Sequence, residues 1–365
     1  MMVGEDKLTG LETNVPLSEF TTIGLGGHAK FFVSCKTVDE IRLAIEFGER
    51  EHLPVEILGG GSNVIFPDEG FNGLVIKIDL KGIQAVDDGE YTTMYVSAGE
   101  VWDDFVESCV EKDLAGIECL SGIPGSVGAT PIQNVGAYGQ EVKDAIVSLK
   151  AMDRKSLRVV EFDGGECEFG YRQSRFKSKD KGKFIIIEVC YKVKNSGGPS
   201  LKYEELWDYI ESKKKENGNG RQQAGTIDLR MVREAVLALR RRKSMLIDPA
   251  DPNSRSVGSF FVNPVLSELE YASFKEKLNS VGIKRAPAYK SPDGTKISAA
   301  WLIENSGFSK GYKRNGVGIS TNHSLALVNY SGSTREILAL ASDIETAVHE
   351  KFGIKLGKEA VVISS

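Results

Sequence analysis

Residues 121–139 are the most informative segment of the chain, and they read Ser-Gly-Ile-Pro-Gly-Ser-Val-Gly-Ala-Thr-Pro-Ile-Gln-Asn-Val-Gly-Ala-Tyr-Gly. Prolines stiffen this segment, and its glycines and small side chains let a flat ligand approach the backbone closely. A disordered linker would carry more charge and fewer apolar residues. The plain alternative is an ordered Ω-loop. The composition favours a segment that binds a ligand.

A second glycine-rich stretch lies upstream, where residues 57–65 read Ile-Leu-Gly-Gly-Gly-Ser-Asn-Val-Ile. The three glycines offer consecutive backbone N–H groups, and Ser62 and Asn63 add side-chain donors. Such a concavity suits an anion, above all a pyrophosphate. The alternative is a tight hairpin, which needs only about two turn residues. Residues 59–63, three glycines followed by two polar residues, are longer than such a turn needs, which favours phosphate binding.

Two familiar nucleotide motifs are excluded by their context. Gly24-Leu-Gly-Gly-His-Ala29 matches G-x-G-x-x-A, but the dinucleotide fingerprint must open a helix, and this one opens the strand predicted over residues 31–34. The glycines at 59–61 are not followed by Gly-Lys-Ser/Thr, so they do not form a Walker loop.

Around these motifs, β-rich runs alternate with a few amphipathic helices. The capping-box pattern Thr37-Val-Asp-Glu40 predicts one helix, and the apolar spacing over residues 102–110 predicts another. This order is typical of an α+β fold with short crossovers. Strands are predicted over residues 31–34, 55–58, 74–78, 94–97, 146–152 and 184–193.

The composition changes in the second half of the chain. A helix is predicted over residues 204–212, a polar linker or loop over 213–226, and another helix over 228–242 that ends in Arg240-Arg-Arg-Lys243. This basic run fits two roles equally: complementing the helix dipole, or clamping a phosphate. Further helices are predicted over 297–304 and from the capping box at Ser333 to Gly353, and strands over 317–319, 326–330 and 360–363.

Length and composition set the broad class. The chain has 365 residues, and roughly 100–200 residues per domain predicts two or three domains. Hydrophobic residues (41%) and charged residues (27%) exclude wholesale disorder. No apolar stretch is long enough to span a membrane, and the N-terminus has no apolar signal core. The net charge of −5 gives no electrostatic basis for nucleic-acid binding.

The cysteines and histidines argue against disulfide or metal sites. The five cysteines are odd in number and form no C-x-x-C pair, which fits a reducing, cytoplasmic compartment. The four histidines are scattered without metal-ligand spacing, so no metal is expected.

Taken together and in order, five motifs resemble the UDP-N-acetylenolpyruvoylglucosamine reductase family. They are Leu-Gly-Gly-Gly-Ser-Asn, Ser-Gly-Ile-Pro-Gly-Ser-Val-Gly, Pro-Ile-Gln-Asn-Val-Gly-Ala-Tyr-Gly, Phe169-Gly-Tyr-Arg-Gln-Ser174 and Gly258-Ser-Phe-Phe-Val-Asn-Pro264. The resemblance runs from about residue 22 to about residue 361, which is nearly the whole chain. One such motif is moderately specific, but five in the same order are highly specific.

The resemblance implies a fold and a cofactor. The expected fold is α+β, with a two-subdomain FAD-binding module of the vanillyl-alcohol-oxidase type and a C-terminal α/β substrate-binding domain. The expected ranges are 1–80 and 81–212 for the FAD subdomains, 213–226 for a linker, 227–350 for the substrate domain, and 351–365 for a segment returning to the active site. The implied FAD-binding residues are Gly59, Gly60, Gly61, Ser62, Asn63, Gly122, Ile123, Pro124, Gly125, Ser126, Gly128 and Tyr138.

The resemblance also implies a reaction, in which NADPH reduces an enolpyruvyl double bond through bound FAD. Arg172 would hold the substrate carboxylate with its planar guanidinium. Glu359 would face the developing negative charge, which helps only if this glutamate is protonated. Ser259 would donate the proton to the α-carbon. The implied substrate contacts are Tyr203, which closes over the substrate, and Lys243, Asn263 and Asn305.

Other functions are weighed against this one. An oxidase of the same flavoprotein superfamily often attaches FAD through a histidine, but neither His28 nor His52 has a convincing attachment context. A flavin- or nucleotide-sugar-binding sensor would not need Ser259, Arg172 and Glu359 together. The sequence therefore predicts an enzyme acting on a small molecule, with no nucleic acid, membrane insertion or obligate protein partner.

Overall fold

The computed structural model describes residues 8–217 and 227–364. The chain divides into two compact units whose segments alternate along the sequence. The first unit holds the chain up to Val15, then Ala29–Gly60 and Asn72–Arg242. The second holds Pro16–His28, Gly61–Phe71 and the chain from Lys243 onward.

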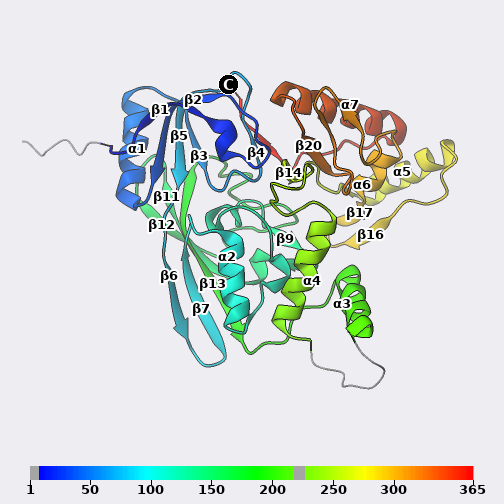
Figure 1. Cartoon of the computed structure of the whole chain (residues 1–365), viewed down its shortest axis with the longest axis horizontal. Coiled ribbons are helices and arrows are strands. Elements are labelled where there is room, and N and C mark those ends of the chain that lie inside the picture. The colour runs from blue at the N-terminus through cyan, green and yellow to red at the C-terminus, as the bar shows by residue number, and fades with distance from the viewer. Residues whose placement is uncertain (1–7, 218–226, 365) are drawn as a thin grey trace, which may run out of the picture. The chain divides into compact units, whose positions relative to one another are not determined.

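One sheet of the first unit has the strand order β1-β2-β5-β3, and helix α1 covers one of its faces (Figure 1). The Thr37–Glu40 capping box predicted from the sequence is present at the start of α1. Apolar side chains of α1, including Ile41 and Ile45, are buried against this sheet. The elements are β1 (Glu12–Pro16), β2 (His28–Cys35), α1 (Val38–Arg50), β3 (Val55–Leu58) and β5 (Phe71–Ile78).

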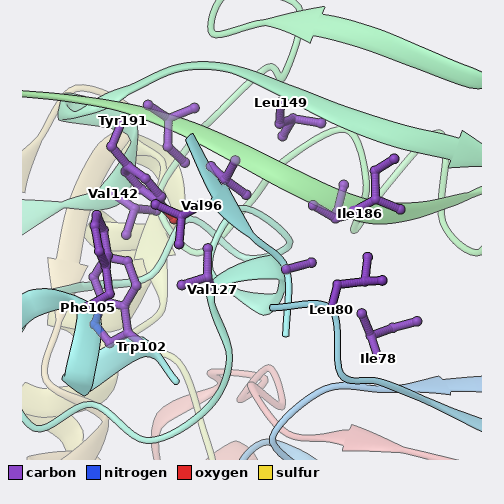
Figure 2. Close-up of a cluster of buried hydrophobic side chains, with 14 of the residues drawn as sticks. Ile78, Leu80, Val96, Trp102, Phe105, Val127, Val142, Leu149, Ile186 and Tyr191 are labelled. Atoms are coloured by element: carbon purple, nitrogen blue, oxygen red, sulfur yellow. The ribbon is translucent and has the colours of Figure 1, made fainter. Parts of the chain in front are cut away.

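A larger sheet of the first unit has the order β12-β11-β13-β7-β6, with β8 paired to β13. Tyr191 of β13 packs with Trp102 and Phe105 of helix α2 (Trp102–Glu111) in the core, and the ring centroids of the three lie 5.2–5.9 Å apart (Figure 2). The strands are β6 (Ile83–Asp87), β7 (Tyr91–Ser97), β8 (Leu114–Ala115), β11 (Ile146–Asp153), β12 (Val159–Asp163) and β13 (Phe184–Asn195).

Helices and tight turns complete the first unit. Helix α3 packs beside α4 around a small apolar cluster that includes Cys119, Leu206 and Val236. The elements are α2 (Trp102–Glu111), α3 (Glu204–Asn217), α4 (Leu229–Arg242), β9 (Gly136–Ala137), β10 (Gln140–Glu141), and the 3-10 turns η2 (Glu118–Leu120), η3 (Val127–Ala129) and η4 (Val142–Asp144).

The second unit is also a mixture of helices and antiparallel sheets. One sheet has the order β14-β20-β19-β18, another has the order β15-β17-β16, and β4 pairs in parallel with β21. The elements are η1 (Leu17–Phe20), β4 (Val64–Ile65), β14 (Ser256–Ser259), β15 (Val265–Leu266), α5 (Glu268–Ser280), β16 (Ala288–Ser291), β17 (Gly294–Ile297), α6 (Ala299–Glu304), β18 (Lys313–Arg314), β19 (Val317–Ile319), β20 (Ala326–Asn329), α7 (Thr334–Phe352) and β21 (Val361–Val362).

Two regions differ from the sequence prediction. The predicted linker over 213–226 begins inside α3, which continues to Asn217, and its remaining residues, 218–226, lie outside the described part of the chain. Helix α4 belongs to the first compact unit because its apolar residues pack with α3 and Cys119. The predicted ranges remain a prediction about functional domains, since the compact units divide the chain at other positions.

The cysteines and the apolar character of the helices complete the description of the fold. All five cysteines are free and buried. Among the described helices, none has both the length and the apolar character that crossing a membrane requires.

Candidate functional site

The two glycine-rich segments meet within the first unit. A Cβ atom on Gly60 would lie 2.7 Å from Gly125 Cα, and a Cβ on Gly59 would lie 2.6 Å from Ser126 Oγ. Main chain therefore packs against main chain at this point, which only glycine allows. The hairpin alternative for residues 57–65 is excluded, because β3 pairs with β5 whereas β4 pairs with β21.

Polar side chains of two helices hold the loop that begins at Gly122. Asp103 of α2 accepts the Gly122 N–H at 2.5 Å, and Arg240 of α4 donates from Nε to the Gly122 carbonyl at 3.0 Å. Arg233 donates to both carboxylate oxygens of Asp103, at 2.6 and 3.1 Å. Burial lowers the pKa of Arg240, although Tyr138 and Asp103 oppose the shift. The first arginine of the basic run thus fixes the loop, a role that neither sequence reading anticipated.

Two tyrosines meet at the end of this loop. The rings of Tyr138 and Tyr203 lie edge to face, with centroids 5.5 Å apart. Tyr138 adopts a left-handed backbone conformation with φ 47°, which is strained for a residue with a side chain. Burial raises the pKa of Tyr138 to about 12, while the nearby Arg240 partly offsets the shift. The structure therefore brings a predicted cofactor residue against a predicted substrate residue.

Arg172 lies in the same unit. Its Nη2 donates to the Gly136 carbonyl at 2.7 Å, and its backbone also has a positive φ of 53°. Asn134 stabilises this region, because its buried side chain donates to the Gly170 carbonyl at 2.9 Å and to Glu141 at 3.0 Å. The Phe-Gly-Tyr-Arg motif is thereby fixed to the second half of the glycine-rich segment.

In the second unit, Ser259 lies at the end of β14, where it pairs with Ala326 of β20. It follows Gly258, whose φ is 70°, and precedes two fully buried phenylalanines, Phe260 and Phe261. The Glu359 N–H donates to the Phe260 carbonyl at 2.8 Å, and Lys358 bridges Phe261. The chain near the C-terminus therefore brings Glu359 beside the segment that carries Ser259.

The end of the first glycine cluster also lies in this unit. Asn63 Nδ2 donates to the Glu359 carbonyl at 3.1 Å, and the Val361 N–H donates to the Asn63 carbonyl at 3.0 Å. Gly61 packs so tightly that a Cβ would lie 1.8 Å from the Phe20 carbonyl oxygen. Asn63 and Glu359, distant in sequence, are thus held side by side by the parallel pairing of β4 with β21.

The two predicted substrate asparagines stabilise opposite ends of helix α6. Asn263 Oδ1 accepts the Ala299 N–H at 2.9 Å, and Asn305 Nδ2 donates to the Trp301 carbonyl at 2.9 Å. These are the cap interactions expected of asparagine, and they fix both side chains next to the helix. Lys243, another predicted substrate contact, is half-buried and is the first residue of the last segment of the second unit.

One polar residue of the first unit escaped the sequence reasoning. Glu118 is 1% exposed and accepts three hydrogen bonds from Gly116, Gln140 and Ser200. A lone charge in the otherwise apolar run from Leu114 to Leu120 was the available signal, because a buried carboxylate must be paired. Among the described residues, no group of histidine, cysteine or carboxylate side chains has the arrangement needed to hold a metal ion.

Comparisons with known proteins agree on one family. Residues 29–162 match the family model described as FAD binding domain, and residues 249–363 match UDP-N-acetylenolpyruvoylglucosamine reductase, C-terminal domain. The reductase of that name from Thermobifida fusca is 44% identical over 361 residues, covering 97% of this chain and 98% of its own. The one from Streptomyces avermitilis is 42% identical over 358 residues, covering 96% and 94%.

A solved structure shares the fold. The crystal structure of UDP-N-acetylenolpyruvylglucosamine reductase from Thermus caldophilus superposes with a TM-score of 0.62 at 23% identity, covering 96% of this chain and 98% of that one. Together with the two family matches, this confirms the fold class predicted from the sequence, a flavin-binding module followed by a reductase C-terminal domain.

Proposed function

The chain belongs to the UDP-N-acetylenolpyruvoylglucosamine reductase family, and we propose that it reduces the enolpyruvyl double bond of UDP-N-acetylglucosamine enolpyruvate to UDP-N-acetylmuramate, a precursor of peptidoglycan. NADPH is the proposed reductant and FAD the proposed bound cofactor. The observation that carries the proposal is the 44% identity to a reductase of that name over 97% of this chain.

The residues present fit a flavin dinucleotide. A Cβ on Gly60 would lie 2.7 Å from Gly125 Cα and one on Gly59 would lie 2.6 Å from Ser126 Oγ, so the two glycine-rich segments are in direct contact. In this proposal the loop residues of 59–63 and 122–128 and Tyr138 would hold FAD. When bound, FAD supplies the chemistry that carries a hydride from NADPH to the substrate.

The reaction needs stabilisation of negative charge. An enol ether is electron-rich, but conjugation with a carboxylate lets hydride add at the terminal carbon, which leaves charge on the α-carbon and the carboxylate. The Arg172 guanidinium matches a carboxylate in shape and charge. Its Nη2 bond to Gly136 and its fixed backbone favour one orientation before substrate binds. Glu359, in protonated form, would donate a hydrogen bond to the developing charge.

The second requirement is a proton for the α-carbon. Ser259 is the last residue of the short strand β14 and pairs with Ala326 of β20, so the sheet fixes the backbone that carries its hydroxyl. A serine hydroxyl is a weak acid, and only a strongly basic carbanion-like intermediate can take its proton. The proposed roles are therefore Arg172 and Glu359 for charge, and Ser259 as the catalytic acid.

Binding of the nucleotide sugar is assigned to Tyr203, Lys243, Asn263 and Asn305. The expected domain ranges and a returning C-terminal segment also belong to this proposal, with the position of Glu359 beside Phe260 in support. A cytoplasmic location is proposed because five free, buried cysteines suit a reducing compartment. The chain is proposed to act without an obligate protein partner.

The experiment uses the purified flavoprotein under anaerobic conditions. After the flavin is reduced with NADPH, the enolpyruvyl nucleotide sugar is added and reoxidation is followed by absorbance. In Ser259→Ala, reduction should proceed normally and reoxidation by substrate should slow by roughly 100-fold or more, as expected for the loss of a general acid. Ser280→Ala, an exposed serine of the second unit, is the matched control.

The outcomes separate the candidate functions. If the nucleotide sugar reoxidises the flavin of Ser259→Ala at the wild-type rate, the proton-donor assignment is refuted. Rapid reoxidation of the wild-type protein by oxygen, with none by the nucleotide sugar, would favour an oxidase. A preparation that takes up no flavin would refute the proposal as a whole.

A further inference from the structure

We propose that Glu118 is a positioning residue, whose buried carboxylate sets the place of Tyr203 relative to Tyr138. This inference rests on the proposed function, in which Tyr203 closes over the substrate. The Glu118 carboxylate accepts hydrogen bonds from Gly116, Gln140 and Ser200, and none of these three residues is assigned to cofactor or substrate. Its role would be exerted entirely through hydrogen bonds to two loop segments of the first unit.

The carboxylate of Glu118 joins three segments of the chain. Its Oε1 accepts both the Gln140 side-chain N–H and the Ser200 backbone N–H, each at 2.8 Å. Its Oε2 accepts the Gly116 N–H at 2.7 Å. Hydrogen bonds to an ionised acceptor in a low-dielectric interior are shorter and stronger than those between neutral groups.

A second set of bonds closes this arrangement into a ring. Gln140 Oε1 accepts the backbone N–H of Cys119 at 2.8 Å, and the Cys119 thiol donates to the Ser200 carbonyl at 3.2 Å. Both peptide groups around Ser200 are thus attached to the turn that carries Glu118 and Cys119. The ring leaves little freedom for the segment at 200 to move relative to the segment at 140.

Each tyrosine is close in sequence to a residue of this hydrogen-bonded ring. Tyr138 stands two residues before Gln140, and Tyr203 stands three residues after Ser200. The connecting backbones are also in contact, since a Cβ on Gly139 would lie 3.3 Å from Lys202 Cβ and 3.6 Å from the Tyr203 nitrogen. A shift at Ser200 must therefore be transmitted to the edge-to-face tyrosine pair.

The buried carboxylate of Glu118 destabilises the turn relative to apolar packing, which suggests that its hydrogen bonds serve to position the attached segments. Burying a carboxylate carries a desolvation cost that apolar packing would avoid, and its best-attested use in proteins is to specify one arrangement. The tyrosine side chain that it would control is 41% exposed, so packing alone does not fix it. The geometry points to Glu118 as the residue that supplies this specification.

The test measures substrate binding and flavin reduction separately in the holoenzyme. Glu118→Ala should raise KM for the nucleotide sugar by roughly tenfold, a change equivalent to about 1.4 kcal/mol, and Glu118→Gln should raise it less. The rate of flavin reduction by NADPH should stay within about twofold of wild type. Thr92→Val is the matched control, because it removes another side-chain hydrogen bond of the first unit, from the buried Thr92 to the half-buried Asn195, outside the ring.

A double-mutant cycle asks whether Glu118 acts through Tyr203. In a Tyr203→Ala background, Glu118→Ala should add almost nothing to KM, whereas independent effects of the two substitutions on KM would multiply. Hydrogen exchange of the peptide spanning residues 198–206 should also accelerate in Glu118→Ala and not in Thr92→Val, because the Ser200 amide loses its acceptor.

Independent, multiplicative effects on KM, or unchanged exchange in the 198–206 peptide, would overturn the inference. If Glu118→Ala fails to fold, Gln140→Met opens the same ring from the other side and should reproduce both results. Failure of the proposed function is distinguishable, because then the wild-type flavin itself would not be reoxidised by the nucleotide sugar.

Discussion

Gly60 faces Gly125 with so little space that a Cβ on residue 60 would stand 2.7 Å from the partner's Cα atom and 2.9 Å from its carbonyl carbon. Both neighbours are backbone atoms, so no flexible side chain can move aside. The contact joins the two glycine-rich segments that the sequence singled out. Their approach, and with it the shape of the proposed flavin-binding surface, depends on the absence of one methyl group.

Gly60→Ala should therefore lower both stability and flavin retention. Forcing a methyl group into this contact should cost roughly 1–3 kcal/mol of unfolding free energy, the usual range for overpacking. Flavin absorbance per protein after gel filtration should fall with it. Gly198→Ala is the control, because a Cβ at residue 198 meets nothing within 4 Å and should leave both quantities unchanged. If Gly60→Ala and Gly198→Ala have the same stability and flavin content, the backbone around Gly125 can move to accommodate the methyl group.

Removing the Ser200 hydroxyl should not destabilise the protein. Ser200 Oγ is buried and has no hydrogen-bond partner among the described residues, while the backbone of Ser200 keeps its bond to Glu118. Because an unsatisfied buried hydroxyl carries a desolvation penalty, Ser200→Ala should be neutral or stabilising by about 1 kcal/mol. Urea denaturation measures this difference.

Thr130→Val gives the opposite case for comparison. Its Oγ1 bonds the Val127 carbonyl at 2.9 Å and the Tyr191 hydroxyl at 2.8 Å, so its loss leaves buried groups unpaired. A cost of about 1–3 kcal/mol is expected. A loss of stability in Ser200→Ala as large as in Thr130→Val would mean that the Ser200 hydroxyl has a partner, such as bound water.

The raised pKa of Tyr138 predicts a loss of stability in alkali. Burial lifts its pKa to about 12, above the value near 10 expected in the unfolded chain. The neutral phenol is favoured in the folded state, so its contribution is complete below about pH 10 and is lost as the pH rises toward 12. Tyr138→Phe should therefore lose less stability than wild type between about pH 9 and pH 11, by up to roughly 1–2 kcal/mol. An equal loss of unfolding free energy in wild type and Tyr138→Phe between these two pH values would contradict the prediction.

Asn263→Asp should separate the structural role of this side chain from its proposed contact with substrate. The carboxylate can still accept the Ala299 N–H, and a negative charge at the start of α6 complements the helix dipole. Stability should remain within about 1 kcal/mol of wild type or rise. Affinity for the anionic nucleotide sugar should fall, as measured by titration of the oxidised flavoprotein. Asn263→Ala should lose both, and unchanged affinity in Asn263→Asp would argue against the substrate contact.

Much of the architecture follows from local sequence signals. The capping boxes at Thr37 and Ser333 mark where α1 and α7 begin, and Gly353 takes the left-handed conformation that ends α7. These signals are local because a few side chains satisfy the free backbone groups at a helix end. The motif order was also enough to predict the family.

The rest depends on contacts between residues distant in sequence. Asp103 and Arg240 hold the loop at Gly122, yet each is an ordinary charged residue of a helix when read along the chain. Glu118 stands out as a charge in an apolar run, but that run does not indicate that its carboxylate holds the loop at Ser200. The capping box at Ser267 that opens α5 was a local signal and could have been found. The pairing of Asn63 with Glu359 required β4 and β21 to meet, which no short window of sequence reports.

The interleaving of the two units has a consequence for synthesis on the ribosome. Segments Pro16–His28 and Gly61–Phe71 emerge early, but they complete a unit whose main part starts at Lys243. At a synthesis rate of roughly 5–20 residues per second, about 10–30 s would pass between the synthesis of Phe71 and that of Lys243. During that interval the residues of β4 cannot pair with β21, because that strand is made only near the end of synthesis, so this part of the second unit can form only after translation is nearly complete.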